Sequence, residues 1–501
     1  MILSLAVRSI WRANTFVPLR CCCHGSQRVA KYSSVQSSPR VGIVGSGPAG
    51  FYTAQYILKH HPTAQVDIFE KLPVPFGLVR YGVAPDHPEV KNATNTFEEV
   101  AQNERFRFFG NVNIGQDLKA VDLQSAYNAV VFAYGADDDK RLHIEGEDGK
   151  GVIAARSFVG WYNGLPAHAE LSPNLDCETA VVVGHGNVAL DVARILLAPL
   201  ALLEHTDICH HAIEALQNSR VKRVILLGRR GPLEVSFTIK ELREMIRLDG
   251  TKPVLRAEDF VDIRPKVPEI VRQRRRLIDL MCKTALDEPS PKDSARFDAA
   301  LKEWHLEFLS SPQEILLDDS NNVKGIRIQK NELIEDEDGS TVAKATDQTV
   351  DIECGMVLRS IGYKSIPLQE GVPFDNKMGV IPNINGRVVQ QAGSKELVKG
   401  LYCSGWVKHG PVGVIVTTMN EAFATAETIV KDLNAGAVNQ ETNISDVGEL
   451  LRGRGVNFVS YEDYQKIDME EIWRGKQSSK PREKIVDTSE MLDFASHDGK
   501  S

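Results

Sequence analysis

The chain has 501 residues, of which 42% are hydrophobic and 25% charged, and a formal net charge of −8. This length exceeds one ordinary hydrophobic core and favours two domains of about 200 residues or more. The composition is that of a soluble globular protein, and its acidic balance argues against non-specific binding to nucleic acid. Nowhere do 18 apolar residues follow one another, so any membrane contact is expected to be peripheral.

The first 38 residues have the composition of a mitochondrial transit peptide. They carry five cations and no carboxylate, because the first acidic residue of the chain is Asp67. Mitochondrial import favours such a basic, acid-free segment, so we predict a protein of the mitochondrial matrix. A basic tail retained in the cytosol is the alternative. The five cations are Arg8, Arg12, Arg20, Arg28 and Lys31, and a chain without them has a net charge of about −13.

A first glycine-rich loop follows the apolar run at 41–44 and reads Gly45-Ser46-Gly47-Pro48-Ala49-Gly50. A helix is predicted over 51–59, so the glycines fall where a strand turns into a helix. There the first glycine makes a tight turn, the second lets the backbone approach a pyrophosphate, and the third lets the helix pack close to the strand. The next predicted strand ends in Glu70, which can accept both hydroxyls of an adenosine ribose and would repel a 2′-phosphate. The loop therefore predicts an FAD site.

A second loop, Gly184-His185-Gly186-Asn187-Val188-Ala189, follows the apolar run at 180–183. The next strong strand, at 224–228, ends in Arg229 and Arg230. Two guanidinium groups at this point suit a 2′-phosphate through charge-assisted, bidentate contacts, so the second loop predicts an NADPH site. A solvated arginine pair beside a turn is the alternative. The long spacing between loop and arginines predicts a helical insertion at about 196–218.

Two apolar strands whose ends contain small residues and glycine, at 129–135 and 356–363, bracket the second loop like the crossovers of reductases with two dinucleotide sites. Further on, 400–406 is predicted as a strand and tight turn, and 410–415 as a turn that opens a helix through Ala424. A helix N-terminus aimed at the flavin pyrimidine would stabilise negative charge on the reduced ring. An ordinary strand-turn-helix is the alternative.

A basic block interrupts the acidic background at 264–266 and 272–276. At helical spacing Arg272, Arg275 and Arg276 share a face, and Arg243, in a helix predicted over 240–247, could join them. Such a block would steer an acidic partner. A solvated helix face is the alternative.

The cysteines exclude neighbouring classes of enzyme. Three of the eight lie in the first 38 residues, and the other five contain no Cys-x-x-Cys pair. The chain therefore lacks the dithiol through which thioredoxin-type and glutathione-type reductases pass electrons to a disulfide. It also lacks a four-cysteine pattern for zinc or an iron–sulfur cluster, so electrons must leave the flavin for an external acceptor. The five cysteines are Cys177, Cys209, Cys282, Cys354 and Cys403, and we expect them to be reduced.

From about Pro39 to its C-terminus the chain resembles the adrenodoxin reductase family. The motifs that carry the resemblance are 41–50, 75–88, 186–194, 228–232, 237–244 and 405–408. The resemblance implies an α/β fold with two Rossmann-like domains of the glutathione-reductase type, the NADPH domain being inserted into the FAD domain. It also implies a mitochondrial NADPH:ferredoxin oxidoreductase with FAD as cofactor and a small acidic [2Fe–2S] ferredoxin, adrenodoxin, as acceptor. We expect a monomer with at most peripheral contact to the inner membrane.

The same resemblance assigns residues to each site. FAD contacts carry over to Ala49, Glu70, Leu78, Ile114, Trp406, Gly413, Val414 and Ile415. NADPH contacts carry over to His185, Gly186, Asn187, Val188, Arg229, Arg230, Glu241 and Gly413, and ferredoxin docking to Arg243, Arg272 and Arg276. The family usually has Gln where this chain has His185. Little loss is expected from this change, because backbone atoms make most contacts in such a loop.

A mechanism follows in which the nicotinamide C4 of NADPH passes hydride to flavin N5, and single electrons then leave for successive ferredoxins. The resemblance places His87 and Asp191 near the flavin, as the titratable pair on the path of the departing proton. His87 could equally serve as a structural hydrogen-bonding residue. Asp191, close to the start of a helix, could equally stabilise the helix dipole.

We therefore expect a transit peptide at 1–38, an FAD domain at 39–138 and 366–501, and an NADPH domain at 139–365. A flavin monooxygenase would carry a further glycine-rich signature, and a relative of the small subunit of glutamate synthase would carry an N-terminal cysteine-rich domain. A non-enzymatic nucleotide-binding protein is disfavoured by the two intact loops. The ferredoxin could supply mitochondrial haem monooxygenases of steroid and sterol metabolism, iron–sulfur cluster assembly, or both.

Overall fold

The structure, a computed structural model, describes residues 38–336, 341–368 and 371–496. The predicted transit peptide, apart from Ser38, lies outside these ranges. Within them, every helix is too short or too polar to cross a membrane.

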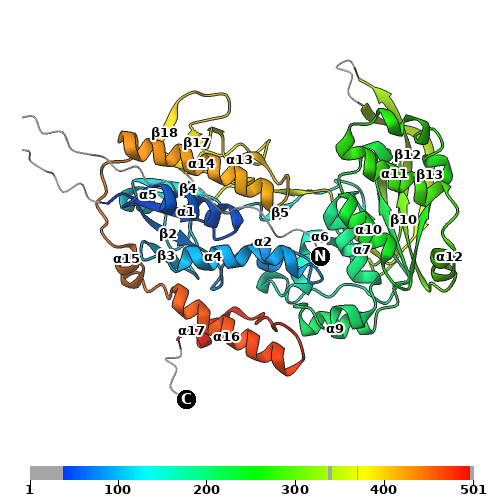
Figure 1. Cartoon of the computed structure of the whole chain (residues 1–501), viewed down its shortest axis with the longest axis horizontal. Helices are drawn as coiled ribbons and strands as arrows, with labels where there is room; N and C mark the ends of the chain where they lie inside the picture. The colour runs from blue at the N-terminus through cyan, green and yellow to red at the C-terminus, as the bar shows by residue number, and fades with distance from the viewer. Residues whose placement is uncertain (1–37, 337–340, 369–370, 497–501) are drawn as a thin grey trace, which may run out of the picture. The chain divides into compact units, whose positions relative to one another are not determined.

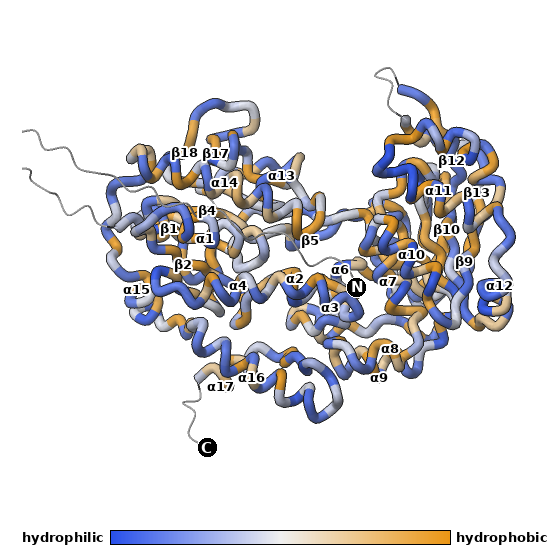
Figure 2. The backbone as a smooth tube through the Cα atoms, in the orientation of Figure 1, coloured by the Kyte–Doolittle hydropathy of each residue, from blue (hydrophilic) through white to orange (hydrophobic). Residues whose placement is uncertain are grey.

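The first parallel sheet takes strands from both ends of the chain (Figure 1). Its strand order is β16 (Asn383–Ile384), β17 (Arg387–Val389), β18 (Leu397–Cys403), β4 (Ala129–Phe132), β1 (Arg40–Val44), β2 (Gln65–Phe69) and β3 (Phe106–Phe109). From β18 to β3 the strands are parallel, and β16 and β17 extend the sheet in antiparallel pairing. All four residues of β4 are buried and apolar, and this strand is a hydrophobic segment in Figure 2.

The second sheet is wholly parallel and lies within the stretch of chain that interrupts the first. Its order is β6 (Val152–Ala154), β14 (Met356–Arg359), β7 (Thr179–Val183), β8 (Arg223–Leu227), β10 (Lys302–Glu307) and β9 (Thr251–Leu255). The chain passes between the sheets through β5 (Asp138–Asp139) and β15 (Tyr363–Lys364), which pair with each other.

A third sheet consists of β11 (Ser310–Leu317), β12 (Val323–Glu335) and β13 (Thr341–Glu353). The predicted α/β fold with two nucleotide-binding sheets is confirmed, whereas the exact domain limits stay a prediction.

Helices connect and cover the strands. They are α1 (Pro48–His60), α2 (Leu78–Tyr81), α3 (Pro88–Lys91), α4 (Ala93–Ala101), α5 (Ala120–Ala126), α6 (Ala155–Tyr162), α7 (Asn187–Leu197), α8 (Leu200–Leu203), α9 (His210–Gln217), α10 (Ile239–Arg247), α11 (Arg272–Leu286), α12 (Pro291–Asp298), α13 (Trp406–His409), α14 (Ile415–Ala435), α15 (Val447–Gly453), α16 (Tyr461–Gln477) and α17 (Thr488–Ser496). The predicted insertion is confirmed, since α8 and α9 lie between β7 and β8. The predicted helix through Ala424 is confirmed as α14, which continues until Gly436 ends it in the left-handed conformation.

Both parallel sheets are buried on both faces, because neighbouring side chains of a strand point to opposite sides. In β7, Val182 packs into the core beneath α7, whereas Val181 and Val183 pack into a second core. That second core also contains Ile326 and Ile328 of β12, so the three-stranded sheet covers one face of the second parallel sheet. Two-sided burial explains why the strands next to each loop are continuous apolar runs.

Candidate functional site

The first glycine loop leaves room for a ligand at its middle glycine. Gly45 has φ +105°, and a Cβ there would lie 2.5 Å from the carbonyl oxygen of Ala133. A Cβ on Gly50 would overlap the carbonyl oxygen of Gly45. Gly47 differs, because its φ of −75° is ordinary and a Cβ on it would meet no atom within 4 Å. Since Gly47 is also the N-cap of α1, the open space lies at a helix N-terminus, where backbone N–H groups can bind phosphate.

Glu70 is fixed beside this loop at the end of β2. Its Oε2 accepts hydrogen bonds from the Ser46 backbone N–H (3.1 Å) and the Ser46 hydroxyl (2.7 Å), and its Oε1 accepts one from Leu72 N–H (3.1 Å). Burial raises the pKa of Glu70, and these hydrogen bonds oppose that rise. Oε1 has a further lone pair, so the group can still accept a hydrogen bond from a ribose hydroxyl.

Two of the predicted FAD segments converge on the start of α1. A Cβ on Gly405 would lie 2.5 Å from the Cβ of Ala49, which places Trp406 beside the loop. The Trp406 ring stacks on Tyr363, with centroids 5.7 Å apart. A Cβ on Gly77 would lie 3.0 Å from the Cα of Gly47, so that Leu78, the next residue, begins α2 alongside it.

The other predicted FAD residues are held near these elements. Ile114 is buried two residues beyond Val112, whose N–H donates to the carbonyl of Glu70 at 2.8 Å. Val414 is the N-cap of α14, Ile415 is its first residue, and α14 packs along α1. Gly413, predicted to serve both nucleotides, has φ +93° and lies against Thr417 of the same helix. Its described contacts do not bring it to the second loop.

The second glycine loop repeats the geometry of the first. Gly184 has φ +134°, and a Cβ there would overlap the carbonyl oxygen of Ser360. Gly186, the N-cap of α7, has φ −108° and no atom within 4 Å of the Cβ position. Thr238 N–H donates to Oδ1 of Asn187 at 2.8 Å, which ties this loop to the N-cap of α10. The loop therefore has its own open cradle at a helix N-terminus.

His185 turns its side chain into the protein. Its Nε2 lies 2.9 Å from the carbonyl oxygen of Leu226 and donates to it, and the ring packs edge-on against Phe308 with centroids 4.9 Å apart. Burial lowers the pKa of His185 to about 4, so the imidazole is neutral at physiological pH. The side chain supports the loop from beneath rather than facing the open space at Gly186.

Arg229 and Arg230 follow the end of β8, and both side chains are exposed. Neither guanidinium forms an ion pair with a carboxylate of the described residues. Both charges are thus available to an anion.

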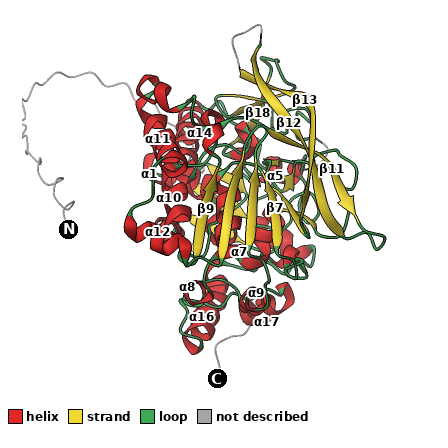
Figure 3. Cartoon of the chain, turned by 90° about the vertical axis from the view of Figure 1, so that its right-hand side faces the viewer, coloured by secondary structure: helices red, strands yellow, loops and turns green. Residues whose placement is uncertain are grey.

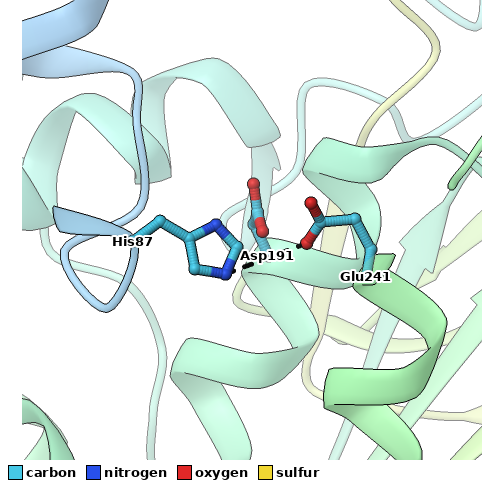
Figure 4. A group of neighbouring side chains, drawn as sticks. All are labelled: His87, Asp191 and Glu241. Atoms are coloured by element: carbon cyan, nitrogen blue, oxygen red, sulfur yellow. Dashed lines mark ion pairs between the residues drawn. The ribbon is translucent and has the colours of Figure 1, made fainter. Parts of the chain in front are cut away.

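The two halves of the chain meet at a cluster of ionisable side chains. Figure 4 shows His87 from the segment before α3, Asp191 from α7 and Glu241 from α10 pointing toward one another. Arg194 joins them: its guanidinium contacts Asp191 at 2.7 Å and Glu241 at 3.4 Å. It also forms a bidentate pair with Asp86 at 2.5 and 3.1 Å. The His87 Nε2 in turn lies 2.8 Å from Glu244 Oε2 and 4.0 Å from Glu241 Oε2.

Burial shifts the protonation of this cluster. It raises the pKa of Asp191, against the opposing charge of Arg194. Burial, together with the nearby Asp191, raises the pKa of Glu241 to about 7. For Asp86 burial is outweighed by the hydrogen bonds and charge of Arg194, so its pKa is lowered. A carboxyl group with a pKa near 7 beside an imidazole can take up or release a proton at neutral pH.

Three members of this cluster, Asp86, Arg194 and Glu244, were not predicted as site residues. Each lies inside a motif that carried the family resemblance, at 75–88, 186–194 or 237–244. That location is the signal that could have identified them.

The predicted docking residues Arg243, Arg272 and Arg276 are all exposed, and their helices α10 and α11 contact each other. The first turn of α11 has no acidic residue and no side-chain cap. Cations at a helix N-terminus oppose its dipole, by about 0.3–1 kcal/mol each. Arg274, in the same turn, instead donates to the carbonyls of Leu233 and Val235, both at 2.7 Å. The positive charge of Arg272 in this first turn therefore does not stabilise the helix.

Known proteins resemble the chain over most of its length. Residues 39–240 match the family described as pyridine nucleotide-disulphide oxidoreductase. The chain is 52% identical over 469 residues to the mitochondrial NADPH:adrenodoxin oxidoreductase of Homo sapiens, covering 93% of this chain and 94% of the relative. It is 45% identical over 470 residues to the Drosophila melanogaster protein of the same name, covering 94% and 96%. The solved structure of Mycobacterium tuberculosis FprA in complex with NADPH is 38% identical and has a TM-score of 0.83, covering 91% of this chain and 99% of that one.

Proposed function

The chain belongs to the NADPH:adrenodoxin oxidoreductase family, and we propose that it oxidises NADPH and passes the electrons through FAD to adrenodoxin. The observation that carries this proposal is the pair of open cradles at Gly47 and Gly186, each at a helix N-terminus. One cradle is flanked by a fixed carboxylate and the other by an exposed arginine pair. This difference supports FAD at the first loop and NADPH at the second.

FAD, when bound, accepts a hydride and releases electrons singly. The chain would hold its pyrophosphate at the start of α1 and its adenosine ribose at Glu70. The N-terminus of α14, which packs along α1, would favour negative charge on the reduced ring if it faces the flavin.

NADPH would be held by the start of α7 and by the side chains of Arg229 and Arg230. Two guanidinium groups can contact one 2′-phosphate through several charge-assisted hydrogen bonds, which NADH cannot form. His185 takes no direct part, because its ring faces the carbonyl of Leu226.

One NADPH brings two electrons and leaves one proton behind once both electrons have gone to ferredoxin. His87, Asp191 and Glu241 are proposed to receive that proton. This proposal is supported by the cluster around Arg194. In this cluster the pKa of Glu241 is about 7, and His87 Nε2 lies 4.0 Å from Glu241 Oε2. These side chains come from both halves of the chain, so the cluster requires the two halves to be apposed.

Adrenodoxin is proposed to be a [2Fe–2S] ferredoxin that docks on Arg243, Arg272 and Arg276. The arginines of α11 support this surface, because they are exposed and lie near a helix N-terminus, where the helix dipole disfavours positive charge. The chain as a whole is acidic, so this basic surface is a local feature. We further propose a monomer in the mitochondrial matrix with at most peripheral contact to the inner membrane. The mitochondrial names of the relatives support the organelle.

The docking proposal is tested by charge reversal in the FAD-loaded protein. Arg272→Glu with Arg276→Glu should raise the KM for adrenodoxin at least ten-fold and leave NADPH-dependent reduction of a small uncharged quinone intact. The matched control reverses the same number of charges at the exposed Lys395, just before β18, and Lys399, within β18. Higher ionic strength should also weaken the reaction with adrenodoxin alone, since exposed charges are screened beyond about 8 Å at physiological salt. Equal losses with adrenodoxin and quinone would refute the docking surface.

A further inference from the structure

The long β12–β13 hairpin, which Figure 3 shows extending beyond the second parallel sheet, reaches the backbone of the arginine pair. The contact is made by Asn331 of β12, whose side chain is only 7% exposed. The pairing of β12 with β13 shifts register between Gln329 and Asn331. Such a bulge re-aims a side chain out of the regular alternation of a strand.

Asn331 holds Arg229 directly and Arg230 through one intermediate. Its Nδ2 donates to the carbonyl oxygen of Arg229 at 2.9 Å and to the hydroxyl of Ser311 at 2.8 Å. The backbone N–H of Asn331 donates to the carbonyl of Leu309 at 2.7 Å, and the N–H of Leu309 donates to the carbonyl of Arg230 at 3.2 Å. Both carbonyls of the arginine pair are therefore held by hydrogen bonds, one from Asn331 and one from Leu309.

The backbone that supports the arginine pair includes one unfavourable conformation, at Leu309. Leu309 has φ +50°, a left-handed conformation that is uncommon for a bulky residue. Beyond the arginines, a Cβ on Gly231 would come within 3.2 Å of Leu333 Cδ1, so the hairpin also packs against the next residue of the loop. Strain of this kind persists where the surroundings over-determine a backbone position.

We propose that Asn331 is a positioning residue that sets the preference for NADPH over NADH by holding the backbone of Arg229 and Arg230. The inference rests on the proposed role of that pair in binding the 2′-phosphate. Two long side chains can meet one phosphate only if their Cα atoms are fixed in spacing and direction. A one-ångström displacement of such supporting backbone is enough to weaken binding.

The test compares Asn331→Leu with Gln329→Leu in the FAD-loaded protein. Gln329 is a matched control on the same strand, because its Nε2 donates to the carbonyl of Thr346 at 2.8 Å and not to the arginine loop. Asn331→Leu should raise the Kd of 2′,5′-ADP, measured by calorimetry, by about three- to ten-fold, the effect of one lost hydrogen bond. The KM for NADPH should rise in parallel, whereas kcat and the KM for NADH should not change. Asn331→Ala serves as a second variant should the leucine variant fail to fold.

Unchanged binding of 2′,5′-ADP in both Asn331 variants would overturn the inference, as would an equal loss in Gln329→Leu. A parallel rise in the KM for NADH would also overturn it, because that would indicate general damage to the nucleotide site. Removing both arginines distinguishes a failure of the Asn331 inference from a failure of the proposed NADPH assignment. If Arg229→Ala with Arg230→Ala retains the preference for NADPH, the NADPH assignment itself fails. If the arginine variant loses the preference and Asn331→Leu does not, only the positioning role fails.

Discussion

Replacing Gly47 by valine should remove FAD and leave the fold intact. The backbone of Gly47 has φ −75° and ψ −175°, an extended conformation open to any residue. A Cβ there meets no protein atom within 4 Å, so the new side chain would fill only the space assigned to the pyrophosphate. The expected cost to the fold is that of an altered N-cap, about 1 kcal/mol or less.

The expected cost to FAD binding is much larger. If the valine displaces the pyrophosphate from two backbone N–H groups, and each such charged hydrogen bond contributes roughly 1.5–3 kcal/mol, affinity falls by about two to four orders of magnitude. Substitution at Gly50 would not give so clean a result, because its Cβ would overlap the backbone of Gly45 and disturb the fold itself.

The assay is flavin absorbance per protein after purification, with circular dichroism to report folding. Gly47→Val should be folded and colourless. Gly186→Val is the matched control, because its Cβ position is equally open, and it should remain yellow while losing affinity for 2′,5′-ADP. A yellow Gly47→Val variant with full flavin content would refute the placement of FAD, and the opposite pattern in the two variants would mean that the two nucleotides are exchanged.

Three further predictions concern single sites. Arg229→Ala with Arg230→Ala should weaken NADPH binding by about 3–6 kcal/mol, from roughly 1.5–3 kcal/mol for each of two charged contacts, and leave the KM for NADH nearly unchanged; retained preference for NADPH in steady-state kinetics would contradict this. His185→Gln should change the KM for NADPH by less than about three-fold, because the imidazole hydrogen-bonds Leu226 within the protein; a larger change would mean that this side chain reaches the nucleotide. Glu241 keeps its proton in the folded chain up to about pH 7 but loses it near 4.5 when unfolded, so stability should fall as the pH rises from about 4.5 to 7; Glu241→Gln should flatten this decline in Tm, and an unchanged slope would assign the decline to other groups.

Features that depend on neighbouring residues could be predicted from the sequence. Both glycine loops, the strands before them and the residues at the ends of the following strands lie where expected, since each follows from local spacing and apolar periodicity. The helix through Ala424 also lies where expected, and Gly436 ends it in the left-handed conformation.

Contacts between distant segments could not be predicted in this way. Asp86 and Arg194 are separated by 108 residues and His87 and Glu244 by 157, so no local pattern joins them. The direction of the His185 ring depends on its rotamer and on the buried Leu226 carbonyl, which a loop motif does not specify.

The central claim is that electrons pass from NADPH through this chain to adrenodoxin. The most direct measurement is an anaerobic titration of the FAD-loaded protein with NADPH in the presence of excess oxidised adrenodoxin, followed by the visible absorbance of the [2Fe–2S] cluster. Two reduced adrenodoxins are expected for each NADPH consumed, and a much slower initial rate of reduction when the same concentration of NADH is used. Consumption of NADPH without reduction of adrenodoxin, or an equal initial rate with NADH, would contradict the central claim.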